Sequence, residues 1–176
     1  EVVSCAMEGE KLASGGYHAD NAAPAVMGGI VLIRGYEPLD LIQLPVPGNV
    51  YCAVVHPQRV VTTKEAREIL PKAVPRHDAV RQWGNVGGLV AGLCTGNIGL
   101  IGHSMQDYVA EPYRKQFIPG LDGLRTKILK AGALAMNISG SGPSVFALCD
   151  NRNVAEISGR ILKEHFDALE VGSEVY

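Results

Sequence analysis

The sequence ALAMNISGSGPSVFALC, residues 133–149, decides the fold. Two apolar runs, 133–138 and 145–149, favour strands, and they flank a turn built only from serine, glycine and proline. The other patterns of this half of the chain are two helices and a final strand, predicted over 121–131, 154–165 and 169–176. This order predicts an α+β fold, a ferredoxin-like split β-α-β sandwich.

Three β-rich runs stand nearer the start of the chain, at 28–35, 39–44 and 49–57. Glycine and proline turns separate them, which predicts an antiparallel meander. Three helices are expected to follow, over 63–70, 77–95 and 98–106. No repeat or linker interrupts these patterns, so strand and helix signals alternate through one continuous domain.

The composition is that of a packed globule. Hydrophobic residues make up 47% and charged residues 19% of 176 positions, and the formal net charge is −2. Such a charge gives no general electrostatic reason to bind nucleic acid or an anionic membrane. The four cysteines are scattered singly, so we expect four buried thiols in a reducing, cytoplasmic protein. The chain opens at Glu1 on a helical pattern without a capping residue, so we expect a fragment cut upstream.

Two stretches of the sequence carry small or polar residues suited to anions and metals. In the turn 139–144, glycines let backbone N–H groups approach an anion and serines add donors, although the turn taken alone favours a tight turn without a ligand. In SGGYHADN, residues 14–21, His18 and Asp20 either form part of a site or cap the next helix. Glu10, on the preceding helix, could help supply the carboxylates that Mg²⁺ prefers beside phosphate oxygens.

Two arginines near loops are further candidates, Arg67 in VVTTKEAREILP and Arg114 in EPYRKQFIPG. The planar guanidinium fork matches a carboxylate or a phosphate in two parallel hydrogen bonds. The alternative is that each is an ordinary solvated surface charge.

Four segments, taken in order, identify a family: GEKLASGGYHADNAAP, VVTTKEAREILP, EPYRKQFIPG and NISGSGPSVFAL. Together they resemble the C-terminal half of the homoserine kinases, which belong to the GHMP kinase superfamily. The resemblance implies ATP-dependent phosphorylation of the side-chain hydroxyl of L-homoserine, a step toward threonine, with Mg²⁺. It also implies that 1–35 is a remnant of the ATP-binding N-terminal domain and 36–176 the GHMP kinase C-terminal domain. A homodimer is expected because two-fold dimers are the commonest assembly of soluble enzymes.

The resemblance also implies roles for individual residues. Arg67 and Arg114 would grip the substrate carboxylate, and His18, Asp20 and Asn21 would orient its ammonium and hydroxyl groups. Asp20 either acts as a base or only orients the substrate together with Asn21, and both alternatives stay open. Further residues would serve the nucleotide: Glu10 as a Mg²⁺ ligand, Thr63 near the transferred phosphoryl group, and Ser139, Gly140, Ser141, Gly142 and Ser144 as a buttress of the phosphate-binding loop.

The sequence departs from the family in one respect, because the glycine- and serine-rich ATP loop is absent from these residues. We therefore expect this chain on its own to show no homoserine-dependent ATP turnover. Two alternative functions differ in class from this one. The first is another GHMP kinase acting on an isoprenoid or a sugar, and the second is a non-catalytic ferredoxin-like module that binds an amino acid.

Overall fold

The computed structural model describes residues 1–14 and 16–176, with the side chains of Ala13, Ser14 and Thr63 outside the description. The chain forms two compact units, Glu1–Val46 and Pro47–Tyr176. The division predicted from the sequence, 1–35 and 36–176, falls at a different position.

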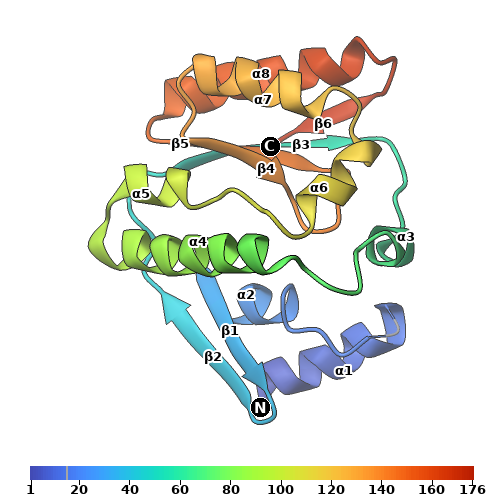
Figure 1. Cartoon of the computed structure of the whole chain (residues 1–176), viewed down its shortest axis with the longest axis vertical. Helices are drawn as coiled ribbons and strands as arrows, with labels where there is room; N and C mark the ends of the chain where they lie inside the picture. Colours follow the sequence, from blue (N-terminus) through green and yellow to red (C-terminus); the bar gives the residue numbers. More distant parts are fainter. Residues whose placement is uncertain (15) are drawn as a thin grey trace. The chain divides into compact units, whose positions relative to one another are not determined.

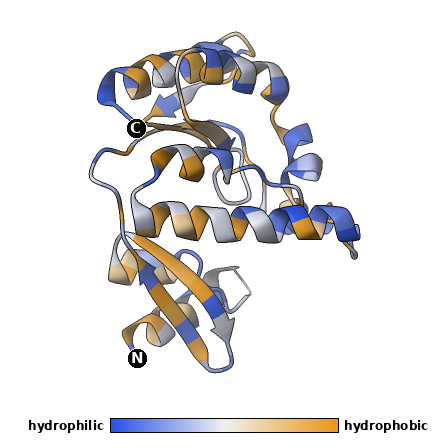
Figure 2. Ribbon diagram, turned by 60° about the vertical axis from the view of Figure 1, so that its left-hand side comes forward, coloured by the Kyte–Doolittle hydropathy of each residue, from blue (hydrophilic) through white to orange (hydrophobic). Residues whose placement is uncertain are grey.

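The first unit contains two helices and a two-stranded antiparallel sheet. Its elements are α1 (Val2–Ser14), α2 (Ala22–Met27), β1 (Ile30–Tyr36) and β2 (Leu39–Leu44). Met7 of α1 and Ala23 of α2 are fully buried, and apolar side chains of both strands pack against them. Figure 2 shows the apolar residues of the two strands in orange. Because β1 pairs with β2 from Ile30 opposite Leu44 onward, both strands belong to this unit.

The second unit is built on a four-stranded sheet with the order β4-β5-β3-β6 (Figure 1). Its elements are β3 (Tyr51–Pro57), α3 (Thr63–Glu68), α4 (Arg76–Thr95), α5 (Ile98–His103), α6 (Glu111–Arg114), a 3₁₀ turn η1 (Lys115–Phe117), α7 (Leu121–Lys130), β4 (Ala135–Ile138), β5 (Val145–Cys149), α8 (Arg152–Asp167) and β6 (Ser173–Val175). All neighbouring strands run antiparallel. Helical segments follow β3 and β5, so the strands and helices form the predicted ferredoxin-like βαββαβ arrangement.

The main hydrophobic core lies between this sheet and the pair α7 and α8, which cover the same face (Figure 1). Alternate residues of β3 and β5 point into it, as the two-residue period of a strand requires. Helix α8 contributes buried residues three and four positions apart, including Leu162 and Phe166. Gly159 of α8 permits a close approach, since a Cβ there would lie 3.1 Å from Cγ1 of Val175.

Two expectations from the sequence are wrong. The run 49–57 does not continue a meander, because β3 lies between β5 and β6 and does not pair with β2. Val55 of β3 is fully buried in the core between this sheet and the helices α7 and α8, so the apolar face of the strand packs there. The expectation of four buried thiols also fails, because Cys149 is buried whereas the other three cysteines are exposed. No helix among the described residues is long and apolar enough to cross a membrane.

Candidate functional site

Arg114 joins the two segments of the second unit that the sequence singled out. Its Nε donates to the carbonyl of Ala66 at 3.2 Å, and its Nη1 donates to the carbonyl of Gly140 at 3.0 Å. Ala66 is fully buried in the last turn of α3, where helix carbonyls lack partners within the helix. The guanidinium therefore stabilises the end of α3 and ties it to the turn 139–144.

Helix α3 is short, and its start is fixed by a capping box. Thr62 is the N-cap residue, and its hydroxyl accepts from the amide of Glu65 at 3.1 Å. The Glu65 carboxylate accepts in return from the amide of Thr62 at 2.9 Å. These hydrogen bonds to the charged form lower the pKa of Glu65, although the carboxyl group is exposed. Capping at one end and Arg114 at the other hold the segment that carries Arg67.

Arg67 itself is exposed, and its guanidinium makes no hydrogen bond or ion pair with any described residue. All of its donors are therefore available to an anion, as the prediction of a carboxylate ligand requires. The solvated surface charge remains the alternative for this residue. Thr63, the predicted neighbour of the phosphoryl group, has its side chain outside the description.

The turn 139–144 closes on itself through backbone hydrogen bonds. The amide of Ser139 donates to the carbonyl of Ser144 at 2.8 Å, and the amide of Gly142 donates to the carbonyl of Ser139 at 3.0 Å. Gly140 and Gly142 have φ of 57° and 83°, in the left-handed region that glycine adopts without strain. The Ser141 hydroxyl makes only a long contact of 3.5 Å to the carbonyl of Gly142. The turn is thus compact, with Ser139 exposed and Ser141 and Ser144 half-buried.

His56 is a site residue that the sequence analysis missed. Its Nδ1 lies 2.7 Å from the Ser144 hydroxyl, and the imidazole is exposed at the end of β3. The pairing of Val55 with Val145 places these two residues side by side across the sheet. In the sequence, the only indication of His56 is that a histidine–proline pair ends an apolar run. This pattern does not point to Ser144 unless the pairing of β3 with β5 is already known.

The residues of the opening segment lie in the first unit. The imidazole of His18 folds against Gly16, where a Cβ would lie 2.2 Å from its Nε2, so this close approach requires glycine. Asp20 is exposed, and its Oδ1 accepts from the amide of Asn21 at 3.1 Å. Asn21 is the N-cap residue of α2, yet its side chain makes no capping hydrogen bond. The alternative of His18 and Asp20 as helix caps therefore receives no support, and the Asn21 carboxamide is left for other use.

Glu10 lies half-buried on α1 in the same unit. Among the described residues, no group of three or more histidine, cysteine, aspartate or glutamate side chains is arranged to hold a metal. A Mg²⁺ ion that takes most of its ligands from nucleotide phosphates and water needs only one or two carboxylates, so the prediction for Glu10 is compatible with the structure.

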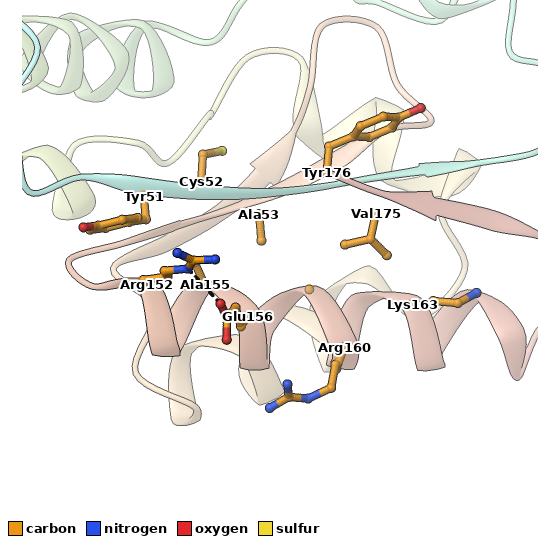
Figure 3. Close-up of a pocket in the computed structure, with 11 residues that line it drawn as sticks. Tyr51, Cys52, Ala53, Arg152, Ala155, Glu156, Arg160, Lys163, Val175 and Tyr176 are labelled. Carbon is orange, nitrogen blue, oxygen red and sulfur yellow. Dashed lines mark hydrogen bonds and ion pairs between the residues drawn. The ribbon is translucent and has the colours of Figure 1, made fainter.

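A cavity of about 510 Å³ lies elsewhere in the second unit, between α8 and the strands β3 and β6 (Figure 3). Cationic residues line it, but they do not converge on one point. Arg152 is paired with Glu156 at 2.9 Å, Lys163 is paired with Asp167 at 3.0 Å, and Arg160 points away from the strands. The charges therefore do not form a built anion site.

Comparisons with known proteins show what the chain is similar to. Residues 89–168 match the family described as GHMP kinases C terminal. The chain is 49% identical over 166 residues to a homoserine kinase from Chlorobium phaeovibrioides, covering 94% of this chain and 52% of that protein. It is 39% identical over 175 residues to a homoserine kinase from Pyrococcus abyssi, covering 99% and 58%. The crystal structure of a homoserine kinase from Cytophaga hutchinsonii superposes with a TM-score of 0.93 at 54% identity, covering 97% of this chain and 54% of that one. The chain spans about half the length of the curated relatives it matches.

Proposed function

Because residues 89–168 match the family described as GHMP kinases C terminal and the chain is similar to homoserine kinases, we propose that the protein to which this chain belongs is a homoserine kinase. It transfers the γ-phosphoryl group of ATP to the side-chain hydroxyl of L-homoserine. The observation that carries the proposal is the bridge made by Arg114, which links the helix of Arg67 to the glycine- and serine-rich turn. Arg114 and the two segments that it links belong to three of the four segments that carry the family resemblance.

The two arginines supply the recognition of an amino acid. The substrate carboxylate binds to the exposed guanidinium of Arg67 and to the N–H groups of Arg114 that the bridge leaves over, three of five. Phosphoryl transfer needs mainly positioning and neutralisation of charge, which such a fixed clamp provides. A sugar acceptor has no carboxylate for this pair to bind. Mevalonate has a carboxylate but lacks the α-ammonium group of an amino acid, so the two arginines alone do not distinguish it from homoserine.

For residues of the first unit, taken by itself, the family resemblance supports further roles. Asn21 and Asp20 orient the acceptor hydroxyl, and His18 helps to hold the ammonium group. ATP supplies the transferred group, Mg²⁺ neutralises the phosphate charge, and Glu10 contributes a carboxylate to the ion. The turn from Ser139 to Ser144 supports the phosphate-binding loop. We place the protein in the cytoplasm as a homodimer, for which light scattering gives the test.

The test is a coupled assay of ADP release by the full-length protein with L-homoserine, mevalonate and galactose as acceptors. We expect turnover with homoserine alone, and its loss when EDTA removes Mg²⁺. Arg67→Met is expected to raise the KM for homoserine at least 10-fold, with the KM for ATP within 2-fold, because only the carboxylate contact is lost. Arg67→Lys keeps the positive charge but not the planar guanidinium, so its KM for homoserine is expected to lie between those of the wild type and Arg67→Met.

Three results would contradict the proposal, each in a different way. Turnover with mevalonate or galactose in place of homoserine would indicate another GHMP kinase. Calorimetric binding of homoserine without turnover would favour the amino-acid-binding module. An unchanged KM for homoserine in Arg67→Met would remove this arginine from the site.

A further inference from the structure

Arg114 lies on α6, which has only four residues. One helical turn is too short to be stable in isolation, so its position depends on contacts with the rest of the unit. The reach of Arg114 to Ala66 and Gly140 therefore depends on whatever anchors α6.

Asp107 and Glu111 provide the anchor at the start of α6. The Asp107 carboxylate accepts from the amides of Val109, Ala110 and Glu111 at 2.7, 2.9 and 3.1 Å, which caps the helix. Glu111 is buried, and its carboxylate accepts from Nη2 of Arg125 on α7. Nε of Arg125 also donates to the carbonyl of Met136 on β4 at 3.0 Å. One ion pair thus connects α6 to α7 and to the edge of the sheet.

The segment before α6 is held from its other side by α4. Nη2 of Arg81 donates to the hydroxyl of Tyr108 at 2.9 Å, and its guanidinium lies 3.9 Å from the centre of the same ring. Asn85 donates to the carbonyl of Gln106 at 2.7 Å. These contacts fix residues 106–108 but do not reach α6. Asn137 of β4 donates to the carbonyl of Met105 before this segment, and Lys115 pairs with Asp122 after α6, whereas Glu111 and Arg125 tie α6 itself to α7 and β4.

We propose that Glu111 and Arg125 are a positioning pair for substrate recognition, which holds α6 where Arg114 can contact both Ala66 and Gly140. The inference rests on the proposed function and deepens it. Neither residue touches the substrate, so both act through the position of Arg114. Only 10% of the Glu111 side chain and 23% of the Arg125 side chain are exposed, so solvent screens the pair weakly. Removing one partner alone would leave a buried charge and would confound positioning with misfolding.

The test variant therefore replaces both partners by apolar residues of similar volume, Glu111→Leu with Arg125→Met, a change that folded proteins often tolerate. The matched control is Lys115→Met with Asp122→Leu. That ion pair, at 3.0 Å, joins η1 to α7 in the same region, but its side chains are 48% and 69% exposed. All variants are made in the full-length protein, and steady-state kinetics for both substrates are measured beside hydrogen exchange.

In the test variant we expect the KM for homoserine to rise about 10-fold while the KM for ATP stays within 2-fold. The reason is that α6 is no longer held in place, so the guanidinium of Arg114 is displaced from the substrate carboxylate. The amides of Leu70 and Gly142, which close α3 and the turn, are expected to exchange at least 10-fold faster. The control variant should match the wild type in both measurements. A folded test variant that equals the control would overturn the inference. Where the wild type itself fails to phosphorylate homoserine, the proposed function is wrong, while the exchange rates still decide whether the pair positions α6.

Discussion

Replacement of Arg114 by methionine tests the central feature of the site. The change removes two hydrogen bonds and keeps most of the aliphatic volume. The carbonyl of Ala66, a fully buried residue, loses its charged donor, which costs about 1.5–2 kcal/mol. The carbonyl of Gly140 is exposed and becomes hydrated, so its loss adds about 0.5–1 kcal/mol. The free energy of unfolding is therefore expected to fall by about 2–3 kcal/mol, equivalent to about 4–12 °C in Tm.

The assay is thermal unfolding of the full-length protein, combined with the KM for homoserine. Arg67→Met is the matched control, because this exposed guanidinium makes no hydrogen bond or ion pair with a described residue and its loss should change stability by less than about 0.5 kcal/mol. Both variants are expected to raise the KM for homoserine, whereas only Arg114→Met should lower the Tm. Equal melting of the two variants would refute a structural bridge at Arg114. A normal KM in Arg114→Met would refute its role as a substrate ligand.

Three further predictions concern neighbouring groups. The hydrogen bonds from Thr62 lower the pKa of Glu65 below its usual 4.5, so the capping box stabilises the fold above that pH and loses this effect as the pH falls through the lowered pKa. The loss of Tm caused by Thr62→Ala at pH 7 should therefore be smaller at pH 3. An equal loss of Tm at both pH values would contradict this. His56→Ala frees the Ser144 hydroxyl and should raise the KM for ATP more than the KM for homoserine, and the reverse order would exclude a role in the turn. Although Cys52 is exposed as a residue, desolvation of its thiol by the groups around it, followed by the nearby Cys149, raises its pKa to about 11. Alkylation by iodoacetamide at pH 8 should therefore be about 100-fold slower in the native than in the unfolded protein, and equal rates would disprove it.

The parts of the fold that the sequence predicts are those set by local patterns. The strands around the turn 139–144 and the helix α8 follow from strand and helix periodicity, and both were found within a few residues of their bounds. The placement of β3 was wrong because strand partners are chosen by the core, and β5 and β6 lie far along the chain. The apolar pattern of 49–57 fits an edge strand of a meander as well as a central strand. Helix α6 was missed because it consists of a single turn.

The same distinction applies to the candidate site. The sequence allowed Arg67 and Arg114 to be proposed from the chemistry of the guanidinium group. It allowed the turn 139–144 to be proposed from its glycines, which let backbone N–H groups approach an anion. The acceptors of Arg114 could not, because they are backbone carbonyls of distant residues, which have no signature in the sequence. His56 was overlooked for the same reason, since its contact with Ser144 follows from strand register.

Glu111 and Arg125 show why positioning residues are harder to recognise than ligand-binding ones. In the sequence, Arg125 follows the buried Leu124 at the border of the apolar stripe of α7, where most arginines are solvated. Its burial becomes evident only when α6 and β4 are placed on either side of it. Groups proposed to bind an anionic ligand here are polar side chains or glycine-containing turns, and both can be recognised in the sequence. A group that holds such a residue in place needs only a partner on another element, so its function is decided by the tertiary structure.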